Sequence, residues 1–293
     1  MALGFGSQPH RDFPVVAALR FALAALWLAL GAGGAIAAEQ PGPDGTVVDY
    51  QPVSGQPGKD VVWVPSPVET VEKMLDMAKL GPKDFVVDLG SGDGRNIILA
   101  AKRGARGLGV EFNADLVQLS RRNAEKEGVA HLVQFTQGDM FETDFSRATV
   151  LALFLLPDNL HRLEPKFRRL APGTRIVANT FGIEGWLPER DESIGGNECR
   201  AWCRVMLYTV PAPVAGRWKA GGSYFEIVQE VQRISGVRTR AKASMPIEGR
   251  IEGMRIRFTS EGLVYAGAVS GDTIRGTVEV RGHKRAWTAK REG

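Results

Sequence analysis

The chain has 293 residues, of which 44% are hydrophobic and 24% are charged, and its formal net charge is +4. This length and apolar content suffice to bury one large core or two smaller ones, and no tract is of low complexity. A disordered chain is therefore excluded, and the sequence predicts a globular protein.

The first 38 residues include a long apolar stretch, residues 13–38, which is interrupted once by Arg20. Arg11 precedes the stretch and residues 35–37 form an A-x-A cleavage pattern, which is typical of a secretory signal peptide. Two alternatives stay open: an uncleaved membrane anchor, for which the apolar part after Arg20 is just long enough, and a mis-assigned start codon. Because basic residues precede the stretch, the signal peptide and the anchor both predict an exported chain, periplasmic or membrane-anchored.

Residues 39–60 are rich in Pro, Gly and Asp without helical or strand periodicity, so we expect a linker there. Regular patterns begin at residue 61 and continue to about residue 200. The expected strands are 84–90, 107–113, 131–139, 148–157 and 174–181, and helical patterns separate them at 95–104, 114–128 and 159–173. Strands that alternate with helices predict an α/β domain over 61–200, a Rossmann-like, mostly parallel sheet flanked by helices.

A glycine-rich turn follows the first predicted strand, in the segment VVDLGSGDGR. It contains Asp88, Gly90, Gly92 and Gly94. Glycine at such a turn lets the backbone approach a ligand beyond the carboxyl ends of the strands. A dinucleotide site would need a further glycine where Arg95 stands, so the turn does not fit that ligand class.

The pattern resembles motif I of the class I S-adenosylmethionine-dependent methyltransferases. That resemblance implies that S-adenosyl-L-methionine is the cofactor and that the glycine turn, with Asp88, contributes to its binding. It also implies that Glu111, at the end of the second strand, accepts both ribose hydroxyls. Asp139, after the third strand, would accept the adenine amino group, and the backbone amide of Met140 would meet the adenine ring.

Residues 61–190 resemble the small lysine N-methyltransferase family more closely. The similarity lies in VPSPVETVEKML, in the long segment that begins with DLGSGDGR, and in LFLLPDNLHRLEPKFRRLAPGTRIVANTF. The family includes mitochondrial enzymes that act on the ATP synthase c-subunit and on a nucleotide translocase. The resemblance implies an S-adenosylmethionine-binding fold and a lysine or other amine as methyl acceptor.

Methyl transfer needs a neutral nucleophile held close to the methyl group in a dry pocket, and it needs no metal. The fourth strand is followed by Phe154, Leu155, Leu156 and Pro157, where methyltransferases of base amines carry Asp-Pro-Pro-Tyr or Asn-Pro-Pro-Tyr. This difference argues against a nucleic-acid base as acceptor. Trp63, Phe154 and Pro157 are accordingly the candidate catalytic residues.

An apolar channel for an alkylamine would be lined by Trp63, Phe154, Phe181 and Trp186, although plain core packing of these aromatic residues is the alternative.

Other reactive residues are scattered. The four histidines do not cluster, so no metal site is predicted. His161 could serve as a general base or could lie on a helix surface. Cys199 and Cys203 are four residues apart, a spacing unsuited to a disulfide on a regular helix or strand, and we expect free thiols.

Residues 204–293 consist of short alternating runs separated by Gly turns, which predict a small antiparallel all-β domain, a meander or barrel of six to eight strands. This segment has 16 Lys or Arg against 8 Asp or Glu. It could therefore contact an anionic partner, or simply carry a charged outer face.

The sequence thus predicts an exported or membrane-tethered methyltransferase that acts on a protein or a small molecule. Because S-adenosylmethionine is made in the cytoplasm, a catalytically silent module of the cell envelope that binds an adenosine-like ligand is the alternative.

Overall fold

The computed structural model describes residues 50–60, 62–195 and 202–292. The predicted signal peptide or anchor, residues 1–38, lies outside this part of the chain. Within the described residues, no helix is both long enough and apolar enough to cross a bilayer.

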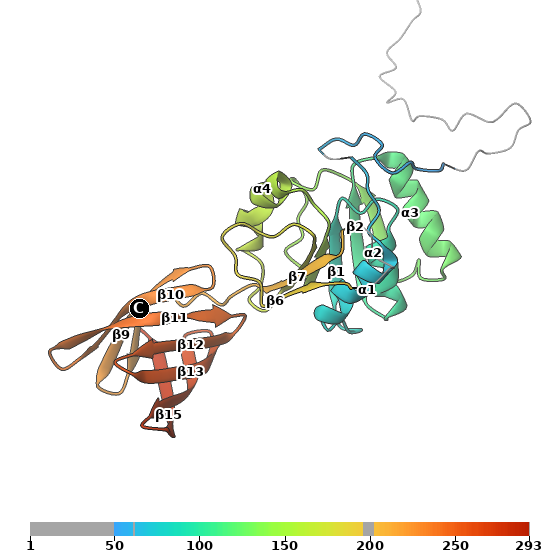
Figure 1. Ribbon diagram of the computed structural model, residues 1–293. Helices are drawn as coiled ribbons and strands as arrows, with labels where there is room; N and C mark the ends of the chain where they lie inside the picture. Colours follow the sequence, from blue (N-terminus) through green and yellow to red (C-terminus); the bar gives the residue numbers. More distant parts are fainter. Residues whose placement is uncertain (1–49, 61, 196–201, 293) are drawn as a thin grey trace, which may run out of the picture. The chain divides into compact units, whose positions relative to one another are not determined.

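The first part of the fold is a seven-stranded sheet with the order β3-β2-β1-β4-β5-β7-β6. Figure 1 labels β1, β2, β6 and β7 of this sheet. Its strands are β1 (Phe85–Leu89), β2 (Arg106–Glu111), β3 (Val133–Gln137), β4 (Val150–Leu153), β5 (Arg175–Asn179), β6 (Arg190–Ser193) and β7 (Arg204–Thr209). Strands β1 to β5 pair in parallel, whereas β7 is antiparallel to both of its neighbours. The prediction of a mostly parallel, Rossmann-like sheet is confirmed.

Helices cover both faces of this sheet. They are α1 (Val68–Met77), α2 (Arg95–Lys102), α3 (Ala114–Lys126) and α4 (Pro157–Phe167). Successive residues of β1 point to opposite faces: Val86 packs in a core cluster with α1, α2 and α3, and Val87 packs in a second cluster with α4. Burial on both faces explains why the central strands are continuous apolar runs.

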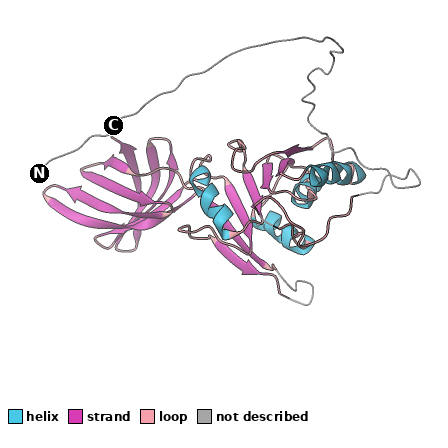
Figure 2. Cartoon of the chain, turned by 90° about the horizontal axis from the view of Figure 1, so that it is seen from above, coloured by secondary structure: helices cyan, strands magenta, loops and turns pink. Residues whose placement is uncertain are grey.

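The second part of the fold is a closed, eight-stranded antiparallel barrel (Figure 2). Its strands are β8 (Gly216–Ala220), β9 (Ser223–Glu230), β10 (Arg233–Arg240), β11 (Ala243–Glu252), β12 (Arg255–Ser260), β13 (Leu263–Ser270), β14 (Thr273–Val280) and β15 (His283–Arg291). Buried Trp218, Phe225 and Phe258 contribute its largest core side chains. The expected small antiparallel all-β domain is confirmed as a barrel.

The strand Arg204–Thr209 differs from the prediction, which grouped it with the all-β domain over 204–293. It pairs with β5 and β6, and the barrel begins only at Gly216. Four consecutive residues of this strand, 205–208, are buried, as expected for a strand inside a sheet that is covered on both faces. Sequence alternation alone does not say which sheet a strand joins.

The expectation of free thiols is wrong for Cys203, which is disulfide-bonded. Cys199, the only other cysteine of the chain, lies outside the described residues. The expectation assumed a regular helix or strand through Cys203, but this residue precedes β7 and belongs to neither.

Candidate functional site

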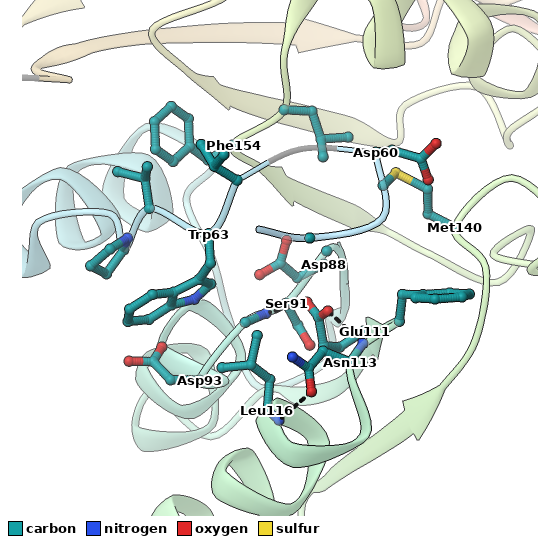
Figure 3. A pocket seen from close by; sticks show the side chains of 18 of the residues that line it. Asp60, Trp63, Asp88, Ser91, Asp93, Glu111, Asn113, Leu116, Met140 and Phe154 are labelled. Atoms are coloured by element: carbon teal, nitrogen blue, oxygen red, sulfur yellow. Dashed lines mark hydrogen bonds between the residues drawn. The ribbon is translucent and has the colours of Figure 1, made fainter. Parts of the chain in front are cut away.

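A cleft opens at the carboxyl ends of β1 to β4, where the strand order reverses between β1 and β4 (Figure 3). Such a switch point is where open α/β sheets bind their ligands. The cleft is lined by the turn after β1, the ends of β2 and β3, the segment after β4, and residues 56–60 and 62–66.

The turn after β1 has a backbone that requires glycine. Gly90, Gly92 and Gly94 all have positive φ, at 81°, 55° and 84°. A Cβ atom on Gly92 would lie 2.4 Å from Nε1 of Trp63, so the indole packs directly against this turn. The predicted glycine residues and Trp63 therefore meet at one wall of the cleft.

Glu111 ends β2 and turns its carboxylate toward the glycine turn. Its Oε2 accepts a hydrogen bond from the backbone N–H of Gly92 at 2.9 Å, and its Oε1 accepts one from the N–H of Asn113, also at 2.9 Å. Each carboxylate oxygen retains acceptor capacity, since a carboxylate offers about four lone-pair sites. Two neighbouring hydroxyl groups of a ligand could be accepted here.

Asp88 lies at the base of the cleft and is almost fully buried, with 3% of the residue exposed. Burial raises the pKa of Asp88 to about 8, and the charge of Glu111 adds to the rise, whereas a hydrogen bond with Asn96 opposes it. At neutral pH this carboxyl group is therefore largely protonated.

Two buried polar atoms near this turn have no hydrogen-bond partner: Oγ of Ser91 and Oδ1 of Asn96. Both residues line the cleft. Because buried polar atoms are nearly always paired in folded proteins, these two atoms mark where a polar ligand group would bind.

Asp139 lies just beyond β3, and its carboxylate is engaged on both oxygens. Oδ1 accepts a hydrogen bond from the N–H of Phe141 at 2.8 Å, and Oδ2 forms an ion pair with Lys59. The hydrogen bond with Lys59 is the main reason that the pKa of Asp139 lies below its ordinary value. The Lys59 ammonium also lies 4.7 Å from the centroid of the Phe112 ring. Met140, next to Asp139, lines the same side of the cleft.

Residues 50–60 and 62–66, here called the arm, contribute to the cleft, and of these only Trp63 was predicted to do so. Residues up to 60 were expected to form a linker, yet residues 56–60 line the cleft. The arm folds back on itself, because the N–H of Gly55 donates to the carbonyl of Trp63 and the N–H of Trp63 donates to that of Gln56. Asp60, on the same arm, lies 3.6 Å from Nη1 of Arg162.

An aromatic wall closes the other end of the cleft. Phe154, after β4, lies with its ring centroid 6.4 Å from that of Phe181 and 5.5 Å from that of Trp202. Phe154 and Phe181 were predicted to line a channel, whereas Trp202 was not, because it follows a segment without periodicity. Trp186 instead packs against Tyr208 in the core.

Two further predicted residues lie away from the cleft. Pro157 begins α4, is exposed and does not line the cleft. The side chain of His161 is 72% exposed on the same helix, with Nδ1 3.3 Å from Glu184. In the ranges that the structure describes, no group of three or more His, Cys, Asp or Glu side chains could hold a metal ion.

Known proteins resemble a part of this chain. Residues 88–190 match the ANTKMT methyltransferase domain. A protein-lysine N-methyltransferase of Saccharolobus islandicus (strain REY15A) is 43% identical over 132 residues, which are 44% of this chain and 82% of that protein. The lysine N-methyltransferase of the ATP synthase c-subunit from Xenopus laevis is 37% identical over 43% of this chain and 56% of its own length.

Among solved structures, an RNA methyltransferase from Salinibacter ruber in complex with S-adenosyl-L-homocysteine is 44% identical, with a TM-score of 0.48. That similarity covers 52% of this chain and 96% of the other. The chain thus spans most of the archaeal relative but only a little over half the length of the frog enzyme.

Proposed function

We propose that this S-adenosylmethionine-dependent methyltransferase, which belongs to the family of protein-lysine N-methyltransferases with the ANTKMT methyltransferase domain, transfers its methyl group to a lysine amine of a protein. For the cofactor, the observation that carries the proposal is the carboxylate of Glu111, which faces the glycine turn with acceptor capacity on both oxygens.

The residues of the cleft fit this cofactor. Glu111 would accept the two ribose hydroxyls, and Asp139 retains a lone pair on each oxygen for the adenine amino group. The unpartnered atoms of Ser91 and Asn96, with Asp88 beside them, would bind the amino acid end. When bound, S-adenosylmethionine supplies an electrophilic methyl group on a sulfonium.

The aromatic wall supports an alkylamine as acceptor. The side chains of Phe154, Phe181 and Trp202 carry no charge and lie against one another. An amine that is buried against them loses contact with water, which lowers its pKa. The neutral amine is the nucleophilic form, so this wall favours the form that reacts. The segment after β4 offers Leu155 and Leu156 instead of the polar residues that would hold a base amine.

An exported or membrane-anchored location is part of the proposal. The apolar stretch at residues 13–38 supports it, and so does the disulfide at Cys203, because disulfides persist mainly in oxidising compartments. The protein acceptor would then belong to the cell envelope. Fusion of a periplasmic reporter enzyme after residue 293 tests this: an inactive reporter would contradict export.

Calorimetric titration with S-adenosylmethionine and S-adenosylhomocysteine tests the cofactor site. We expect residues 39–293 to bind both ligands, and Glu111→Ala to weaken binding at least about tenfold, because hydrogen bonds to a charged group are lost. Glu125→Ala, on the exposed part of α3, removes an equivalent charge and should bind as the unmodified chain does. Equal affinity of the Glu111 and Glu125 variants would contradict the assignment of Glu111.

The acceptor requires a separate test. In a strain that lacks this gene, we expect lysine methylation to disappear from at least one envelope protein and to return with the intact gene but not with Glu111→Ala. If the purified chain binds the cofactor and no methyl-lysine is lost, the lysine acceptor is wrong and the methyltransferase assignment stands.

A further inference from the structure

Three arginines stand side by side on the outer wall of the barrel. Arg233 on β10 pairs in register with Arg250 on β11, which pairs in register with Arg257 on β12. All three are exposed. Directly opposed residues in antiparallel strands are about 5 Å apart at their Cα atoms, so three cations follow one another across the sheet.

Two more arginines lie in the neighbouring row. Arg255 pairs with Ala268, which pairs with Arg275, and both arginines are exposed. Because the side chains of every second residue share a face, these two point outward like the first three. The five residues Arg233, Arg250, Arg255, Arg257 and Arg275 are called the arginine patch below. None of them lines the cleft.

The patch is poorly neutralised by the barrel itself. Glu252 lies 2.8 Å from Arg250 and 3.9 Å from Arg255. Over the described ranges, Arg233, Arg257 and Arg275 form no ion pair. Like charges placed directly opposite one another destabilise a sheet, so the row gives the isolated barrel no advantage in stability. An anionic partner would turn this unfavourable arrangement into a favourable one.

We propose that the arginine patch docks on the headgroups of an anionic phospholipid bilayer. Arginine suits this contact, because its planar guanidinium group binds a phosphate through two parallel hydrogen bonds. Basic side chains near an anionic bilayer also add attraction independently of any specific pocket.

The surroundings of the patch favour separate headgroups over a continuous polyanion. Glu230 is opposite Arg233 at one end of the row of three arginines. Glu248 lies on β11, two residues before Arg250. A nucleic acid strand that followed the row would meet these carboxylates, whereas mobile lipids can avoid them.

The floor between the arginines lacks the groups that read nucleic acids. In register with the row, β13 and β14 contribute Ala266 and Thr277, which offer no aromatic ring for base stacking. Met254, in the turn just before Arg255, is 37% exposed and supplies an apolar tip beside the charges.

The chain also carries a second candidate membrane signal, the apolar stretch at residues 13–38. Stable membrane attachment commonly combines a hydrophobic element with a basic patch, and here both occur in one polypeptide.

Vesicle sedimentation tests the proposal with residues 39–293, which omit the apolar stretch and retain the whole compact unit Tyr50–Gly293. We expect this chain to sediment with vesicles of phosphatidylglycerol and phosphatidylcholine in equal parts, and not with phosphatidylcholine alone. Raising the salt from about 0.1 M to about 0.5 M should release it, because exposed charges are then screened. A chain that fails to bind the anionic vesicles would overturn the proposal.

A triple variant isolates the patch. Replacing Arg233, Arg250 and Arg257 by Ser should weaken vesicle binding roughly 100-fold, at about fivefold for each arginine near the surface. The matched control replaces Arg281, Lys284 and Arg285 by Ser; these residues are exposed around the β14–β15 turn, and the net charge changes equally. The control should bind as the unmodified chain does.

The melting temperature distinguishes lost docking from misfolding. Because opposed like charges are removed, the triple arginine variant should melt at or above the temperature of the unmodified chain. Equal loss of vesicle binding in both triple variants would show a general effect of net charge. It would overturn the proposal that the arginine patch is the docking surface. Retention on immobilised heparin that depends on the row, without vesicle binding, would assign the surface to a polyanion instead.

Discussion

Lys59 on the arm and Asp139 just beyond β3 form an ion pair although 80 positions separate them in the sequence. The same ammonium lies over the ring of Phe112, which directly follows Glu111. The arm therefore brings a cation to the carboxylate that we assign to the adenine amino group. Binding of S-adenosylmethionine and the position of the arm should therefore depend on each other.

Lys59→Met keeps the length of the side chain and removes its charge. We expect S-adenosylhomocysteine to bind up to about fivefold more tightly to this variant, because Asp139 no longer has to give up an ion pair with Lys59. The factor of about five corresponds to the usual upper strength of a partly exposed ion pair. Calorimetry at low and high salt checks whether the ion pair is the cause, because salt screens exposed charges and should reduce the difference in affinity between the variant and the unmodified chain. Weaker binding by the variant would mean that Lys59 helps to hold the ligand.

Gly92→Ala tests the contact between the arm and the glycine turn. The added Cβ would meet the indole of Trp63 at 2.4 Å, so we expect lower stability in urea unfolding and lost cofactor binding. Trp63→Ala removes the obstacle, and the double variant should be more stable than the sum of the two single changes predicts. Strict additivity of the two changes would contradict this contact.

The sheet and its polar strand ends were predictable because local patterns encode them. Asp88 and Glu111 follow apolar residues, Asp139 follows the third predicted strand, and parallel strands bring such ends to one edge. The order of these residues along the chain, together with the resemblance to motif I, therefore locates the cleft.

Most of the arm, and Trp202 in the aromatic wall, were not predictable in the same way. The arm has no periodicity, and its place depends on contacts such as that of Lys59 with Asp139, which no local pattern records. Trp202 likewise lies in the wall, although it belongs to neither a helix nor a strand. Strand β7 was assigned to the wrong sheet, because alternation gives burial but not the identity of the neighbouring strand.

Asp88 predicts a pH dependence of stability. Its pKa is about 8 in the folded chain and near the ordinary 3.8 when unfolded, so the folded state holds an extra proton between these values. Stability should therefore fall as the pH rises from about 4 to about 8, by at most about 1.4 kcal/mol per pH unit from this group.

Asp88→Asn removes this proton while keeping the shape of the side chain. In urea unfolding between pH 5 and pH 8, we expect the variant to lose less stability than the unmodified chain does. Asp115→Asn, at the exposed start of α3, serves as the control and should follow the unmodified chain. Parallel curves for all three proteins would show that Asp88 is ionised in the folded state.

Trp202 and Phe154 should act on the acceptor and leave the cofactor unaffected. Their rings touch, at 5.5 Å between centroids, and both residues line the cleft. We expect Trp202→Ala and Phe154→Ala to bind S-adenosylhomocysteine within about twofold of the unmodified chain. The two rings are assigned to the acceptor, and losing an aromatic contact, which is worth about 1 kcal/mol, weakens only the binding of the molecule that makes the contact. Transfer of labelled methyl groups to envelope proteins from the deletion strain should fall at least about tenfold, since the amine loses its apolar wall.

Tyr224→Ala, which removes a half-buried barrel ring, controls for loss of an aromatic side chain and should transfer methyl groups normally. Unchanged transfer by both cleft variants, at unchanged melting temperature, would place the acceptor elsewhere.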